Sequence, residues 1–258
     1  MIDQLWLIPL GFGAGILGSM IGLGGGIIVV PILTFFGFFP TLAASNSLFA
    51  AFTNAVASTI SYSRQKRVEF SLGLKLGILT IPGTVFGAYI SSDVTPEVFK
   101  ILFGFVLIAS AIYIFLRKKI ESKEQNFSKQ MMVFAIGASF FAGIISAFFG
   151  IGGGIIFVPL MVVGMGMAMK KAAPTSQLIL LFASLSGVIV HTLLGHSDFL
   201  QAGLLGAGSF VGGLIGARLS VEINERYLQI LVSIVIIAAA VKMFFDSLSN
   251  NLFLLITD

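Results

Sequence analysis

Apolar runs of about twenty residues recur along this 258-residue chain. As a helix, each run is long enough to cross a hydrocarbon core of about 30 Å. Six uninterrupted runs cover residues 43–62, 70–91, 97–116, 173–191, 199–218 and 227–246. Two further apolar segments, 4–38 and 131–164, are interrupted by glycines. The sequence therefore predicts an all-α polytopic membrane protein, with the lipid bilayer as its solvent.

The composition supports the same fold class and excludes others. Hydrophobic residues make up 57% of the chain and charged residues 10%, and the mean hydropathy is +1.05, whereas soluble domains carry about 25% charged residues. The segment Met1–Trp6 lacks the basic start of a secretory signal, so we interpret it as mature sequence. The net charge of +4 comes from scattered residues without a nucleic-acid-binding motif, so we expect no nucleic-acid partner.

The chain contains an internal duplication. Residues 15–31 match residues 143–159 at ten of seventeen positions, at an offset of 128. Beyond these segments the offset is 129, and it pairs Ser47 with Ser176. Glycine, serine and proline keep this register, which a chance periodicity of apolar residues would not do.

We therefore expect two homologous halves, residues 1–116 and 130–258, joined by a basic cytoplasmic linker at 117–129. Each half begins with a Gly-interrupted helical hairpin, 4–38 or 131–164, and continues with three of the uninterrupted spans. Glycines spaced four apart inside those spans are typical of close helix packing.

The distribution of Lys and Arg predicts the orientation, because cytoplasmic loops retain basic residues. If each Gly-interrupted segment is a hairpin that enters and leaves on one face, 13 of the 15 basic residues lie inside, and only Lys100 and Lys242 lie outside. If each segment crosses once, the split is 10 to 5. The hairpin arrangement is favoured, and its odd number of spans makes the halves inverted repeats. The loop at 64–69 is then cytoplasmic and the loop at 195–198 extracytoplasmic, whereas eight spans would make the halves parallel.

The hairpins carry the strongest candidate site. Each contains a Gly-x-Gly-Gly-Gly turn, which we name the first tip (Gly22–Gly26) and the second tip (Gly150–Gly154). Three consecutive glycines break a helix and permit positive φ angles. The helix after each tip presents free N–H groups and its positive dipole end toward the membrane midplane. Two such ends that converge form an anion site without a cationic side chain.

The residues expected to line the substrate are the tip glycines and a few polar side chains of the spans that follow. They are Gly24, Gly25, Gly26, Ser47, Asn54, Gly152, Gly153, Gly154, Thr175 and Ser176. Helix packing is the alternative role for the glycines, and capping or interhelical hydrogen bonding is the alternative for the side chains.

Several absences restrict the function. All eleven Asp and Glu residues lie in loops, tails or span ends, so no midspan acid offers a proton relay. There is no cysteine, no nucleophile with a base, and no metal-ligand set, so we expect neither an enzyme nor a cofactor. A nucleotide-binding G-x-x-x-x-G-K-[ST] motif is also missing, which favours secondary transport.

The duplicated tip G-x-G-G-G-[IL]-[IL]-x-V-P, the A-A-x-x-S that follows each copy, and G-A-R-L-S at 216–220 resemble the sulfite exporter TauE/SafE family of prokaryotic permeases. The resemblance covers nearly the whole chain. It implies a multi-pass protein of the cytoplasmic membrane that carries small sulfur-containing anions such as sulfite, sulfonates or sulfoacetate. A transporter of a non-sulfur organic anion and a non-transporting membrane scaffold or subunit are the alternatives. A homodimer is compatible with the sequence.

Overall fold

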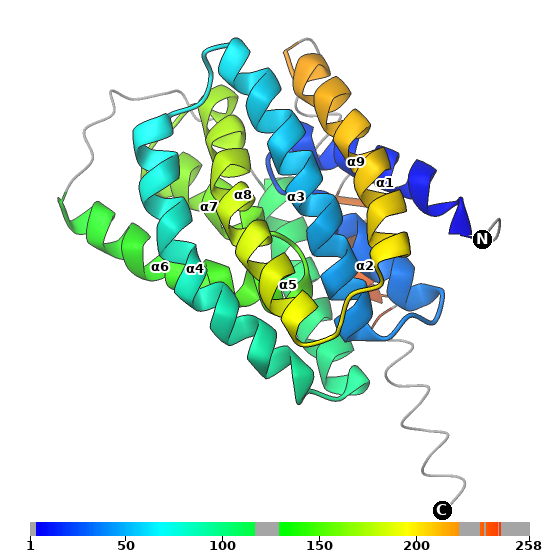
Figure 1. Ribbon diagram of the computed structural model, residues 1–258. Coiled ribbons are helices and arrows are strands. Elements are labelled where there is room, and N and C mark those ends of the chain that lie inside the picture. The colour runs from blue at the N-terminus through cyan, green and yellow to red at the C-terminus, as the bar shows by residue number, and fades with distance from the viewer. Residues whose placement is uncertain (1–3, 117–128, 222–232, 235, 242, 244–258) are drawn as a thin grey trace, which may run out of the picture.

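The computed structural model of the protein describes residues 4–116, 129–221, 233–234, 236–241 and 243. The predicted linker at 117–129 lies outside these residues except for Lys129, as does part of the predicted span 227–246. All regular secondary structure in the described residues is helical, and the helices form one bundle (Figure 1).

Helices lie in both halves of the sequence. Those of the first half are α1 (Leu7–Ile21), α2 (Gly26–Phe35), α3 (Pro40–Arg64), α4 (Phe70–Ser92) and α5 (Pro96–Leu116). Those of the second half are α6 (Lys129–Phe149), α7 (Gly154–Pro159), the π-helical segment η2 (Leu160–Gly164), α8 (Met169–Leu193) and α9 (Phe199–Leu219). The pairs α1–α2 and α6–α7 occupy the segments predicted as hairpins, and the longer helices occupy the predicted spans.

The helices differ in whether they can cross a bilayer. In the described part, α4, residues 130–149 of α6, α8 and α9 are long and apolar enough to do so. With 15 and 10 residues, α1 and α2 rise only about 22 and 15 Å and are too short. The 25-residue α3 is long enough, but its buried serine, threonine and asparagine side chains lower its hydropathy. By length, α1 and α2 are therefore distinct from the long helices that can cross the bilayer.

The outward faces of the long helices are apolar. Phe105 of α5 and Phe134 of α6 expose 61% and 64% of their surface, and Phe86 of α4 and Phe141 of α6 are similarly exposed. A water-soluble protein rarely presents so many contiguous large apolar side chains. These faces contact lipid, and the protein is a polytopic membrane protein.

The two halves are interlocked, because the first helix of each packs along the fourth helix of the other. Helix α1 lies beside α9, and α6 lies beside α4. A Cβ atom on Gly212 would collide with the carbonyl oxygen of Phe12, and a Cβ atom on Gly83 with that of Phe140. Gly83 and Gly212 are repeat equivalents, as are Phe12 and Phe140. The glycines of these spans thus have the packing role predicted for them, since they let two helix backbones touch.

Helices α3 and α8 are repeat equivalents that pack together near the middle of the bundle. They run in opposite directions: in Figure 1, α3 rises from blue to cyan while α8 descends from lime to yellow. Accordingly, Leu48 near the start of α3 contacts Gly187 near the end of α8.

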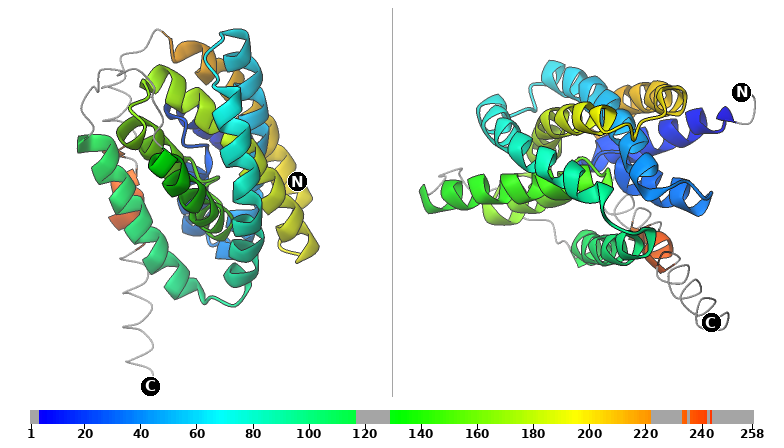
Figure 2. Two further views of the ribbon diagram at one scale, coloured as in Figure 1. Left: turned by 90° about the vertical axis from the view of Figure 1, so that its left-hand side faces the viewer. Right: turned by 60° about the horizontal axis from the view of Figure 1, so that its bottom comes forward.

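Helix α5 lies at the edge of the bundle, beside the helical residues around 236–241, as both views in Figure 2 show. It is attached to α6 by aromatic side chains. Phe99 stacks on Phe148 with ring centroids 5.8 Å apart, and Phe103 stacks on Phe149 at 5.1 Å. Because Phe149 is the last residue of α6, this contact supports the helix end from which the second tip starts.

Candidate functional site

The first tip is a tight turn that starts where α1 ends. Gly22 has a φ of +80° and ends the helix, as a left-handed glycine commonly does. The N–H groups of Gly22, Leu23 and Gly24 all point to the carbonyl oxygen of Gly18, at 3.0, 3.1 and 3.3 Å. Gly24 has a φ of +76°, and α2 then begins at Gly26.

The second tip has the same plan with one different backbone angle. Gly150, Gly152 and Gly153 have φ values of +73°, +87° and +80°. Gly25, the equivalent of Gly153, has a φ of −73° instead. Gly25 therefore does not use the positive φ angle that glycine permits, because it has right-handed helical angles as the N-cap of α2.

The two tips touch each other in the buried centre of the bundle. A Cβ atom on Gly26 would collide with the carbonyl oxygen of Gly150, and one on Gly154 with the carbonyl oxygen of Gly22. Only glycine allows two backbones to approach this closely. The structure thus brings the two predicted tips together from opposite halves of the chain.

Two matched serines hold the tips in this contact. The Ser47 hydroxyl of α3 donates to the carbonyl oxygen of Gly150 at 2.8 Å, and the Ser176 hydroxyl of α8 donates to that of Gly22 at 2.7 Å. Both serines are fully buried. Each serine therefore ties a helix of its own half to the tip of the other half.

Each tip is followed by a helix start with unpaired backbone donors. The N–H groups of Ile28 and Val29 donate to Gly25, and those of Ile156 and Phe157 donate to Gly153. The N–H groups that come just before them, at the first positions of α2 and α7, find no acceptor among the described residues. Unpaired N–H groups at a helix start, together with the helix dipole, attract an anion.

The helices that follow the tips differ beyond their prolines. Helix α2 continues through Pro31 to Phe35, whereas α7 ends at Pro159 and the chain continues as the π-helical segment η2. Proline removes one backbone donor in each case. Only in the second half does the helix type change after the proline.

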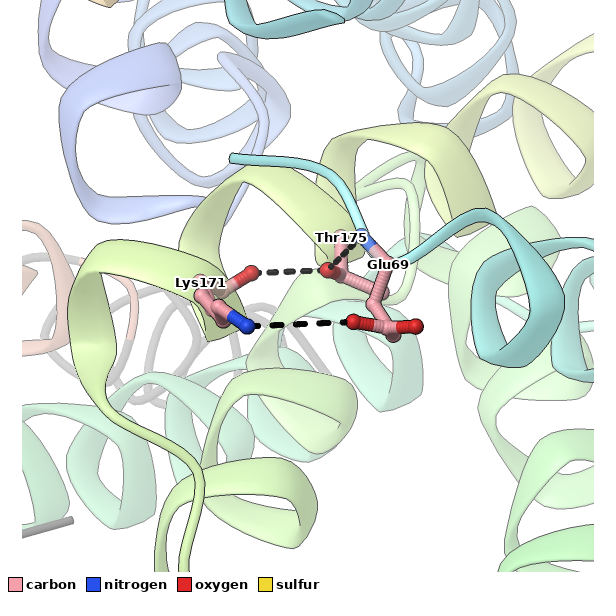
Figure 3. A network of polar contacts seen from close by, with 3 residues as sticks. All are labelled: Glu69, Lys171 and Thr175. Atoms are coloured by element: carbon pink, nitrogen blue, oxygen red, sulfur yellow. Dashed lines mark hydrogen bonds and ion pairs between the residues drawn. The ribbon is translucent and has the colours of Figure 1, made fainter. Parts of the chain in front are cut away.

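Thr175 lies away from the tips. It is in the second turn of α8, where its hydroxyl accepts the N–H of Glu69 at 3.0 Å and donates to the carbonyl oxygen of Lys171 at 2.7 Å (Figure 3). The Lys171 ammonium is 4.0 Å from the Glu69 carboxylate. The contacts of Thr175 in the described structure join the start of α8 to the start of α4.

Asn54 is also separate from the tips, at the interface of α3 with α9. Its side-chain oxygen accepts the hydroxyl of Ser58 at 3.2 Å and lies against Gly213. Its Nδ2 group is buried without a partner among the described residues. A buried donor of this kind is unusual in proteins.

Two residues that sequence reasoning did not assign to the site lie beside it: Gln177 contacts the end of α1 that precedes the first tip, and Leu180 contacts both tips. The Gln177 amide Nε2 donates to the carbonyl oxygen of Gly18 at 3.0 Å, which is the same oxygen that organises the first tip. Leu180 is fully buried and contacts both tips. Gln177 is a polar residue at the start of a span, which is a signal, but Leu180 is an apolar residue in an apolar span and carries none.

Comparison with known proteins places this architecture in a family. The family model described as Sulfite exporter TauE/SafE matches residues 7–243. YunE of Bacillus subtilis, named a probable membrane transporter protein, is similar at 29% identity over 94% of this chain and 97% of its own length. A protein of Methanocaldococcus jannaschii with the same description is 28% identical over 88% of this chain and 90% of its own length. YfcA of Escherichia coli, described likewise, is 25% identical over 91% and 87%.

Proposed function

This chain belongs to the sulfite exporter TauE/SafE family and is a membrane transporter, and we propose that its substrate is a small sulfur-containing anion carried by secondary transport. Sulfite, sulfonates and sulfoacetate are the candidates. Relatives occur in bacteria and in an archaeon, which supports the cytoplasmic membrane of a prokaryote as the location.

The observation that carries this proposal is the meeting of the two glycine tips. Each tip starts a helix whose first N–H groups lack acceptors among the described residues. The starts of the two helices come from opposite halves and meet where Gly26 and Gly154 pack on the other tip. Backbone N–H groups bind an anion through partial charges. The anion is therefore released more easily than from a buried site in which Arg or Lys supplies a full charge.

We further propose that the halves are inverted repeats in the membrane. The opposite directions of the repeat equivalents α3 and α8 support this arrangement. So does the exchange of matched contacts between the halves, in which Ser47 and Ser176 have equivalent partners. Transporters of this kind alternate access by moving one repeat against the other around a site at their interface.

Binding to the purified protein tests the proposed function. Isothermal titration calorimetry with sulfite, sulfoacetate, methanesulfonate as a sulfonate, thiosulfate and acetate should give a signal for one of the sulfur anions and none for acetate. Binding of acetate alone would identify a carboxylate transporter. An absence of binding across the whole series would contradict the proposed function.

Matched glycine variants test the location of the site. Gly152 and Gly153 have similar left-handed φ values of +87° and +80°, so alanine is equally strained at both. A Cβ atom on Gly152 points at Leu180 between the tips, whereas one on Gly153 points at Ala142 of α6. Gly152→Ala should therefore abolish anion binding, and Gly153→Ala should retain it. Equal loss in both variants, or loss of binding in Lys75→Gln, would place the site elsewhere.

A further inference from the structure

One side chain fills the space between the two tips. Gly24 and Gly152 are repeat equivalents, and both are left-handed. A Cβ atom on Gly24 would lie 2.5 Å from Leu180 Cδ2, and one on Gly152 would lie 2.8 Å from the same atom. Leu180 of α8 therefore contacts both tips at once, and it is 0% exposed.

The other half has no such side chain. The repeat equivalent of Leu180 is Ala51 of α3, at the offset of 129. The Cβ atom of Ala51 is 3.6 Å from a Cβ atom placed on Gly152, and Ala51 is not among the nearest atoms to Gly24. Because leucine is larger than alanine by an isopropyl group, the side chain from α8 fills more of the space next to Gly24 and Gly152 than its equivalent from α3 does.

This space is also where the proposed site must hold its substrate. The structure shows Leu180 in contact with the glycines whose neighbouring N–H groups would bind the anion. An apolar side chain forms no hydrogen bond with those donors, so only packing contacts are lost when it leaves. The carbonyl oxygen of Leu180 also accepts the Ser184 hydroxyl at 2.6 Å, a bond that commonly bends helices.

We propose that Leu180 is the occluding side chain of the transporter, which occupies the anion site in the closed state and withdraws with α8 when substrate enters. This inference rests on the proposed function for the identity of the occupant. It adds a residue that controls access, and it assigns that control to one half of the repeat. The affinity for the anion then includes the cost of moving Leu180 out of its contacts.

Thiol accessibility tests the occlusion without any substrate. The chain has no cysteine, so Ala51→Cys introduces a single thiol beside the tips. In this background Leu180→Ala should speed labelling by an anionic, sulfonate-bearing methanethiosulfonate by about tenfold or more, since opening no longer breaks the leucine contacts. Leu178→Ala is the matched control, because Leu178 is a buried leucine of α8 that packs on Gly73 instead.

The outcomes of this experiment are distinct. Faster labelling with Leu180→Ala and an unchanged rate with Leu178→Ala support the proposal. Equal rates in the wild-type and Leu180→Ala backgrounds, or equal acceleration by both leucine variants, overturn it. If Leu180→Ala does not fold, Leu180→Val in the same background should give a smaller acceleration, and no acceleration there would also overturn the proposal.

Anion affinity provides a second measurement. If Leu180 only stabilised the fold, its removal would not be expected to tighten anion binding. With sulfite or sulfoacetate as the probe, Leu180→Ala should bind more tightly than wild type, and Ala51→Leu, which fills the space from the other side, more weakly. Weaker binding by Leu180→Ala with retained folding would contradict occlusion. If the wild type binds none of the anions while labelling still depends on Leu180, the proposed function fails and the occluding role stands.

Discussion

The two halves of the chain keep the same backbone contacts but differ in the side chains at the ends of their central helices. Tyr62 near the end of α3 and His191 near the end of α8 are repeat equivalents. The Tyr62 hydroxyl donates to the carbonyl oxygen of Ser19 at 2.9 Å, and His191 Nε2 is 2.9 Å from the carbonyl oxygen of Ala147, the equivalent of Ser19. The position and the acceptor are retained, while the donor group has changed.

The next matched pair shows what this change means. Arg67 lies over the Tyr62 ring at 5.1 Å, and its Nε donates to the carbonyl oxygen of Lys170. Its equivalent is His196, whose Nδ1 is 3.0 Å from Nδ1 of His191. Arginine is always charged, whereas histidine titrates near neutral pH. The duplication therefore retains the geometry of both ends, and within these matched pairs the histidines lie at one end only.

Membrane orientation gives the sharpest test of this comparison. Arg64 and Leu193 are repeat equivalents, and both are exposed at the ends of α3 and α8. Single cysteines at these positions should be labelled by an impermeant reagent from opposite sides of the membrane, Arg64→Cys from the cytoplasm and Leu193→Cys from outside. Labelling of both from the same side would refute the inverted repeat.

Removing the matched serines should have the next largest effect. Ser47→Ala and Ser176→Ala each leave a buried glycine carbonyl without its donor, so we expect each to lower the free energy of unfolding by about 1–3 kcal/mol. The two losses should be similar because the two bonds are equivalent. Unfolding in mixed micelles would measure them. Ser63→Ala is a control, since Ser63 donates only within its own helix to Thr59, and a comparable loss there would argue against a special role of the tip bonds.

The tips themselves should respond unequally to alanine. Gly153→Ala forces a left-handed angle that costs about 1–2 kcal/mol. Gly25→Ala does not, because Gly25 has a φ of −73° and the added Cβ would lie 3.3 Å from Ala14. The same unfolding measurement should therefore show Gly153→Ala as the less stable variant. Equal stability of the two would mean that the tips share one backbone conformation.

The pH response should be the smallest effect and confined to one end. Burial lowers the pKa of His196 from its usual 6.5. The unfolded chain then binds more protons below about pH 6.5, so this group's contribution to stability is present above that pH and is lost on acidification. Thermal unfolding of His196→Gln should depend less on pH between about 7.5 and 5 than that of the wild type. Arg67→Gln at the other end should leave the slope unchanged, and a flatter slope there would locate the response elsewhere.

Much of this architecture was predictable because it depends on patterns in the sequence. Apolar length gave the spans α4, α8 and α9, and the triple glycines gave the positions of both tips. The partner of Ser47 was not predictable, because the pairing of a hydroxyl with Gly150 depends on how the two halves interlock. The right-handed backbone angle at Gly25 and the contact of Leu180 with both tips were not predictable from the sequence either. Glycine adopts positive and negative φ angles about equally, so the sequence does not select one. An apolar residue in an apolar span can pack against lipid or against any neighbouring helix.

The interlocking of the halves also has a consequence for biosynthesis. Helix α1 leaves the ribosome long before its main neighbour α9, and the Gly22 carbonyl must wait for Ser176 to arrive. Until then the short, unpaired α1–α2 hairpin has neither its packing partner nor its donor, inside a membrane that offers no substitute. The first tip can therefore reach its final contacts only after the second half has been synthesised. Two fragments divided at the linker should reconstitute the transporter only when they are produced together.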